Sequence, residues 1–202
     1  MVAGIAAMGA EFWELKDPDA WTEKEVARLR TNSPWARKEV QEAPAMEARQ
    51  VTKHSGKTVK TTTKQKKVWG HAADVQVRWE SAEPMMATTA RVDSRLHKGF
   101  EEPAKEYYLV SLTGLKLYGL SVEAATEELR TRSALHIAER AVHPRVVRAV
   151  DSAGGPFFLL EFPRRLELDG EKTVELRAHL GQSRLFASFA PRKMIFRGRA
   201  AL

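Results

Sequence analysis

Residues 21–36 read WTEKEVARLRTNSPWA, and this stretch carries two consecutive helix-start signals. In the first signal, Thr22 and Glu25 have the spacing of a capping box. The Thr22 hydroxyl accepts from the amide of Glu25, and the Glu25 carboxylate accepts from the amide of Thr22. Trp21 and Val26 flank the box as a hydrophobic staple, which fixes the angle at which the chain enters the helix.

The second signal is Ser33-Pro34, which predicts a short helix with Ser33 as its N-cap and Pro34 at its first position, where the missing N–H costs nothing. Trp35 follows in the first turn. Burial of indoles contributes strongly to a small core, so we expect an N-terminal arm clasped onto the body by its tryptophans. Exposed indoles would instead form a docking platform, so Trp13, Trp21 and Trp35 are also candidate interaction residues.

Composition sets the broad class of the protein. A chain of 202 residues with 43% hydrophobic residues can bury a core, which indicates a globular protein. The absence of cysteine excludes disulfides, thiolate metal sites and cysteine nucleophiles. No apolar run approaches the roughly eighteen residues of a membrane-spanning helix.

The net charge of +7 is concentrated in one segment, Ala48–Lys67, which contains no Asp or Glu. Its basic residues are Arg49, Lys53, Lys57, Lys60, Lys64, Lys66 and Lys67. The segment has no aromatic residue on which bases could stack, which argues against a nucleic-acid partner. Two interpretations stay open: a solvated loop, or a contact with an anionic surface or polysaccharide, for which the six lysines are the candidate residues.

The sequence divides into four stretches. Residues 1–10 are small and apolar, typical of the tail of an export signal or of a frayed or docked N-terminus. Residues 11–40 form the tryptophan-rich helical arm, and residues 41–67 form either a basic polar linker or an exposed hairpin with its turn at 54–57. Residues 68–202 form an α+β body.

Within the body, the hydrophobic period is first mixed and then that of strands. We expect a strand with Val75, Val77 and Trp79 buried, a helix over 83–99, an apolar strand over 107–112, and a helix from Ser121 to about Leu135. The remainder, 144–202, predicts a five-strand antiparallel meander: 146–150, 157–162, 174–180, 185–189 and 194–202. The fold class is therefore α+β, with the N-terminal arm and central helices packed on a C-terminal antiparallel β-sheet that could close into a β-sandwich.

Five segments in this order resemble a group of exported, uncharacterised acidobacterial-type proteins. They are FWELKDPDAWTEKEVARLRTNSPWA, VQVRWESAEPMM, EYYLVSLTGL, PFFLLEFPR and FAPRKMIFRGRAAL. The W-x-x-x-E-V…S-P-W-A part is the most specific. The resemblance implies an exported location, periplasmic or secreted, rather than a cytoplasmic one, and no particular chemistry, because that family has no established activity.

Catalytic and ligand motifs are missing from the sequence. There is no HExxH, GxSxG, SxxK or nucleotide-binding glycine pattern, so we predict no catalytic, metal-binding or cofactor-binding residues and no cofactor. His71 and Asp74 lie three apart, which a hydrogen bond explains better than a metal. We expect a non-catalytic exported envelope protein that acts by contact with another protein. The alternatives are a polyanion-binding module using 49–67 and a hydrolase with a dispersed active site.

Overall fold

The computed structural model describes residues 11–55, 58–152, 155–166, 168 and 170–202. Its elements in chain order are α1 (Phe12–Leu15), η1 (Pro18–Ala20), α2 (Glu23–Thr31), β1 (Ala36–Ser55), β2 (Thr58–Trp79), α3 (Glu83–Val92), α4 (Ser94–Glu101), α5 (Pro103–Glu106), β3 (Tyr107–Thr113), α6 (Val122–Arg132), β4 (Ala134–Ile137), β5 (Arg140–Val142), β6 (Val146–Ser152), β7 (Gly155–Pro163), β8 (Val174–Leu180), β9 (Ser183–Phe189), η2 (Pro191–Lys193), β10 (Ile195–Phe196) and β11 (Arg199–Ala200). The export interpretation of residues 1–10 falls outside the described residues.

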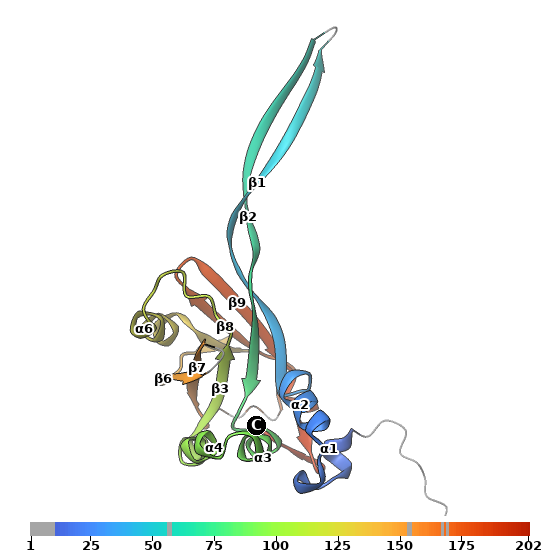
Figure 1. The fold of residues 1–202 in the computed structure, drawn as a ribbon, viewed down its shortest axis with the longest axis vertical. Coiled ribbons are helices and arrows are strands. Elements are labelled where there is room, and N and C mark those ends of the chain that lie inside the picture. Colours follow the sequence, from blue (N-terminus) through green and yellow to red (C-terminus); the bar gives the residue numbers. More distant parts are fainter. Residues whose placement is uncertain (1–10, 56–57, 153–154, 167, 169) are drawn as a thin grey trace, which may run out of the picture.

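The expected α+β class is confirmed, with helices packed on an antiparallel sheet. Nine strands pair in the order β5-β4-β8-β9-β1-β2-β3-β7-β6, and the sheet curls into half of a barrel (Figure 1). Helix α6 contacts both β6 and β8, which lie toward opposite edges of the sheet, so it bridges the two flanks of the curl. A β-sandwich would need two packed sheets, whereas these nine strands belong to one.

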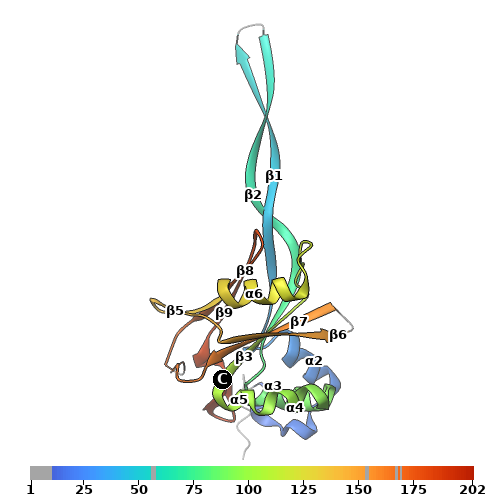
Figure 2. The same cartoon turned by 90° about the vertical axis from the view of Figure 1, so that its left-hand side faces the viewer.

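Strands β1 and β2 extend far beyond this sheet. Their inner ends lie within it, where β2 pairs with β3 from Gln76 to Trp79 and β1 pairs with β9 at Glu42. From Ala43–Gly70 outward they pair only with each other, and this ribbon stands off the body as an arm (Figures 1 and 2). Of the two interpretations of 41–67, the structure therefore has the hairpin. The boundaries expected after residues 40 and 67 fall inside β1 and β2.

We call residues 11–36 the clasp. Its helix begins with the capping box that the sequence of residues 21–36 predicts. Thr22 accepts from the amide of Glu25 at 3.2 Å, and the Glu25 carboxylate accepts from the amide of Thr22 at 2.8 Å, which completes the capping box. Hydrogen bonds from Lys16 and from the Thr22 backbone lower the pKa of Glu25 to about 2. The staple residues Trp21 and Val26 are both buried. The first of the two predicted helix starts is therefore confirmed, and its helix is α2.

The second expected helix start is wrong. Ser33 and Ala36 bond to each other through their backbones in a tight turn, and β1 begins at Ala36. The Ser33 hydroxyl donates to the carbonyl of Leu29 and accepts from the amide of Trp35, so it closes α2 and shapes the turn instead of capping a helix. Pairing with β2 takes the chain into the sheet at this point.

Two helix boundaries also differ from expectation. The helix expected over 83–99 breaks at Asp93, whose carboxylate accepts from the amide of Leu96 at 2.9 Å and starts α4 as its N-cap. Helix α6 ends at Arg132 rather than near Leu135, because residues 134–137 form β4 and pair with β8.

The C-terminal meander is wrong in its connectivity. Strand β7 lies between β3 and β6, and β8 lies between β4 and β9, so these two consecutive strands are not neighbours. The expected fifth strand, 194–202, forms instead the separate two-stranded ribbon β10–β11, with Met194 and Phe196 buried. The alternation over β8 is confirmed, with Val174 and Leu176 fully buried. None of the described helices has the length and apolar character to cross a bilayer.

Candidate functional site

The arm carries its charge on one side. In the hairpin register Glu47 lies opposite Lys66, Arg49 opposite Lys64, and Lys53 opposite Lys60. The three positions on each strand are separated by even numbers of residues. Alternate residues of a strand point to the same face, so the three pairs lie on one face of the ribbon. We call the side that these pairs mark the cationic face. It runs along the ribbon for roughly 20 Å, at about 3.3 Å per residue.

The other side of the arm is almost neutral. Its pairs are Met46–Lys67, Ala48–Gln65, Gln50–Thr63 and Thr52–Thr61. The hydroxyls of Thr52 and Thr61 lie 3.4 Å apart. Lys67 is thus separated from the other lysines, and Lys57 lies outside the described residues.

The described cations of this face form no ion pair, although Glu47 lies opposite Lys66 in the register. Arg49, Lys64 and Lys66 are exposed, and among the described residues none of them forms an ion pair. Like charges placed directly opposite each other destabilise an antiparallel pair, so the Arg49–Lys64 pair works against the ribbon it belongs to. An anionic partner would remove that repulsion.

A second group of residues lies at the base of the arm. The guanidinium of Arg184 sits 3.9 Å from the ring centre of Trp69 and 5.3 Å from that of Phe186, and its Nε donates to Glu42 at 2.8 Å. Trp69 is 45% exposed and Phe186 37% exposed. We call these four residues the base cluster. It presents two aromatic rings to solvent beside the point where the arm leaves the body.

The three tryptophans proposed as interaction residues are in the core. Trp13, Trp21 and Trp35 are 4%, 2% and 0% exposed. Trp13 packs edge-on against Trp35, with ring centres 5.7 Å apart, and Trp35 donates from Nε1 to the carbonyl of Ala201 at 2.6 Å. Their burial leaves these indoles no open platform for a partner protein, and Trp13 reaches the surface only as part of a pocket wall. Trp69, which we did not single out, is the most exposed of the five tryptophans.

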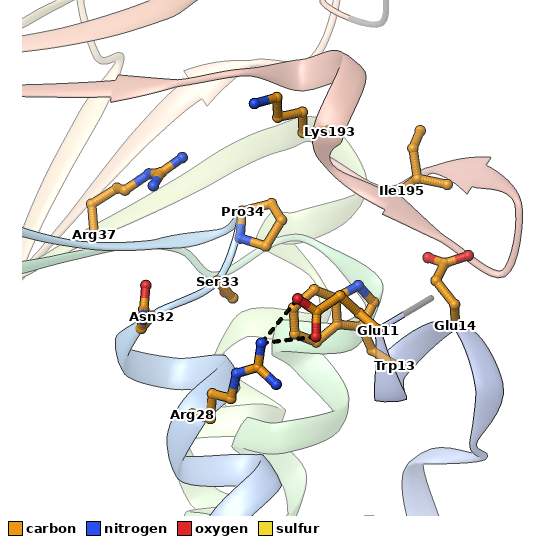
Figure 3. Close-up of a pocket in the computed structure, with 10 residues that line it drawn as sticks. All are labelled: Glu11, Trp13, Glu14, Arg28, Asn32, Ser33, Pro34, Arg37, Lys193 and Ile195. Atoms are coloured by element: carbon orange, nitrogen blue, oxygen red, sulfur yellow. Dashed lines mark hydrogen bonds and ion pairs between the residues drawn. The ribbon is translucent and has the colours of Figure 1, made fainter. Parts of the chain in front are cut away.

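A pocket of about 460 Å³ lies where the clasp meets the C-terminal ribbon (Figure 3). Arg28 donates to both carboxylate oxygens of Glu11, at 2.9 and 2.8 Å, and its guanidinium also lies 5.6 Å from the ring centre of Trp13. Arg37 and Lys193 extend over one side of the pocket, and Glu14 stands on the opposite side (Figure 3). We call this the clasp pocket.

A buried ionic network lies between the clasp and the sheet. Glu80 is fully buried, and its carboxylate accepts from the Ser111 hydroxyl at 2.8 Å. The guanidiniums of Arg30 and Arg78 approach that carboxylate to 3.8 and 3.9 Å. Burial lowers the pKa of Arg78, Glu80 opposes this, and the charge of Arg30 adds to the lowering. The network joins α2, β2 and β3, and it borders a cavity of about 220 Å³.

The residues considered for catalysis and metal binding are dispersed. The Nε2 of His71 donates to the carboxylate of Asp74 at 3.0 Å, and Asp74 also pairs with Lys38 at 2.8 Å. The Lys38 hydrogen bond, followed by that of His71, lowers the pKa of Asp74. Over the described ranges there is no group of three or more His, Asp or Glu residues suited to a metal ion. No histidine borders the clasp pocket or the cavity beside Glu80.

Comparison with known proteins adds no family. No protein-family model, no curated protein and no solved structure matches this chain.

Proposed function

We propose that this protein binds an extended polyanion along the cationic face of its arm, and that the activity involves no catalytic step. The observation that carries the proposal is the register, which gathers Arg49, Lys64 and Lys66 with the paired positions 53 and 60 on one side of a ribbon that stands off the body. Basic residues that are scattered along the sequence therefore lie in one row on the ribbon.

The shape of this row favours a linear partner. Lys64 and Lys66 are two residues apart on β2, about 7 Å, whereas positions 60 and 64 on β2 and 49 and 53 on β1 are four residues apart, about 13 Å. A polymer with repeated anionic groups can therefore contact several of these positions at once. Among polyanions an acidic polysaccharide fits best. The arm segment Ala48–Lys67 offers no aromatic ring for stacking nucleic-acid bases. It also lacks the broad apolar stripe by which a segment inserts into a membrane surface.

Heparin binding across a salt series tests the proposal. Replacing Arg49, Lys64 and Lys66 together by glutamine removes three cations from one face. At about 1 kcal/mol for each cation near an anionic surface, affinity should fall roughly hundredfold. The salt dependence should also become shallower, since fewer counter-ions are released on binding.

The matched control removes the same charge from the body. Lys24, Lys98 and Lys172 are exposed and form no ion pair in the described structure. Their triple glutamine variant should keep nearly all of the affinity. Equal losses in the two triple variants would reduce the effect to net charge and refute the arm as the site. Tighter binding of duplex DNA or anionic vesicles than of heparin would overturn the choice of polysaccharide.

A second candidate function is contact with another protein, and the base cluster favours it. Two exposed aromatic rings flank Arg184 beside a strongly basic arm, so the complementary partner is a protein segment with an apolar side chain next to carboxylates. A photoreactive phenylalanine analogue at Trp69 should cross-link one protein species in the native host, and Phe186→Ser should abolish that product. Cross-links that persist in Phe186→Ser would contradict the candidate.

We also propose that the protein acts outside the cytoplasm, in the periplasm or as a secreted protein. The support is the resemblance noted in the sequence and the apolar residues 1–10. N-terminal sequencing of natively produced protein tests it, because an intact Met1 in the cytosolic fraction contradicts export.

A further inference from the structure

The clasp pocket holds a second set of charges, separate from the cationic face of the arm. Its volume of about 460 Å³ falls within the roughly 300–1,000 Å³ of typical small-molecule sites. Figure 3 shows the ends of Arg37 and Lys193 directed toward one another on one side, Glu14 on the other, and Pro34 and Trp13 between them. The pocket thus has a cationic end and a carboxylate end, with Pro34, Trp13 and the neutralised Arg28–Glu11 pair between them.

The two cations of this end form no ion pair with any described residue. Arg37 and Lys193 form no ion pair and donate no side-chain hydrogen bond within the described ranges, and the Nε of Arg37 is buried without a partner. Glu39, two residues along the same strand, forms no ion pair there; burial raises the pKa of its carboxyl, and the charge of Arg37 offsets this only in part. A carboxylate between the two cations would supply the charge-assisted hydrogen bonds that the fold omits.

The opposite end has an unpaired carboxylate. Glu14 accepts from the amide of Gly198 at 3.3 Å through Oε2, whereas its Oε1 is buried without a partner. Glu11 cannot play this role, because Arg28 already neutralises it with two hydrogen bonds. Leaving a charged group unsatisfied in a protein is costly, and a ligand ammonium would satisfy Glu14.

We propose that the clasp pocket binds a small zwitterion of the amino-carboxylate class. Its carboxylate lies against Arg37 and Lys193, its ammonium against Glu14, and its apolar body against Pro34 and Trp13. A simple anion would leave Glu14 unpaired, and a simple amine would leave both cations unpaired, so the two ends select for a ligand with both charges.

Three probes of equal length test this by calorimetry on the full chain: 6-aminohexanoate, hexanoate and hexylamine. We expect 6-aminohexanoate to bind at least tenfold more tightly than either of the others. Arg37→Gln should reduce its affinity at least tenfold and leave hexylamine binding nearly unchanged. Glu14→Gln should reduce its affinity by a similar factor and leave hexanoate binding nearly unchanged.

Lys193→Gln keeps the test decisive if the other variants fold poorly, because this exposed side chain makes no hydrogen bond or ion pair in the described structure. It should weaken 6-aminohexanoate several-fold, whereas Lys98→Gln, an exposed lysine elsewhere, should have no effect. Equal affinity for all three probes, no binding by the folded wild-type chain, or unchanged affinity in Lys193→Gln would each overturn the proposal.

Discussion

The clasp and the arm are consecutive stretches of the chain, yet opposite kinds of interaction hold them. In the clasp, Trp35 is 0% exposed, packed edge-on against Trp13 and bonded to the carbonyl of Ala201. In the arm, Trp69 is 45% exposed and covered on one side by Arg184. Burial defines the clasp, whereas backbone pairing alone defines the outer part of the arm.

This difference separates stability from recognition. A two-stranded ribbon that packs against nothing is marginally stable, so the arm's outer residues add little to the folded body. They are free to carry charges that repel one another, such as Arg49 and Lys64. Substitutions in the clasp should therefore change the free energy of unfolding, and substitutions in the arm should change binding.

The largest effect expected from this comparison is that of Trp35→Ala. It removes a fully buried indole together with its hydrogen bond to Ala201, and the cost should be about 3–5 kcal/mol. Denaturant unfolding followed by circular dichroism measures it. Trp69→Ala is the matched control and should cost far less, because nearly half of that side chain is exposed. Similar losses at the two positions would remove the distinction between clasp and arm.

Local chemistry made much of the clasp predictable. Thr22 and Glu25 each accept a hydrogen bond from the other's backbone amide within one turn. Such a short-range signal does not depend on the fold of the rest of the chain. The signal at Ser33-Pro34 failed because the same hydroxyl can also close a helix and shape a turn, and the pairing of β1 with β2 decided between them. The predicted meander was wrong for the same reason, because long-range pairing decides which strands are neighbours in a sheet.

The cationic face was visible in the sequence only as a run of lysines. Lys64 and Lys66 show the period of a strand, but the partner Arg49 lies on the other side of the turn. The face appears once the register is known, and the register depends on where the turn falls. The clasp pocket could not be predicted at all, because Glu14, Arg37 and Lys193 come from three distant stretches.

The next effect in size concerns the ionic network that ties the clasp to the sheet. Glu80→Gln leaves the partly buried guanidiniums of Arg30 and Arg78 without a counter-charge, which should cost about 3 kcal/mol. The same denaturant experiment measures it. Glu127→Gln serves as the control, because Glu127 pairs with Arg130 on the exposed surface and should matter little. An unchanged free energy of unfolding in Glu80→Gln would show that the network does not hold the clasp.

A smaller loss is expected from the capping box. Thr22→Ala removes the acceptor of the Glu25 amide and should cost about 1 kcal/mol. Thermal unfolding measures the change, and Thr131→Ala, at the exposed end of α6, provides a comparison outside any cap. Equal stability of Thr22→Ala and the wild type would contradict the role of the box.

Glu25, the carboxylate of the capping box, should make the stability of the protein depend on pH. Hydrogen bonds from Lys16 and Thr22 lower the pKa of Glu25 from 4.5 to about 2, so the folded state binds its proton less readily than the unfolded state. This contribution is complete above pH 4.5 and is lost as the pH falls toward 2. Glu25→Gln should therefore flatten the stability profile over that interval. An unchanged profile would mean that these bonds do not persist in solution.

The smallest effect on stability is also the sharpest test of the comparison, because stability and binding should move in opposite directions. Lys64→Glu turns the Arg49–Lys64 repulsion into an attraction, which should stabilise the arm by about 0.5 kcal/mol and slow the exchange of its amide hydrogens. Heparin affinity should fall at the same time, because the cationic face loses two units of charge. Gln65→Glu places a carboxylate on the neutral face opposite Ala48, so it should leave amide exchange unchanged and weaken heparin binding less than Lys64→Glu does. If Lys64→Glu instead destabilises the arm, the register of the ribbon in solution differs from the one described, and the row of cations on which the proposed function rests does not form.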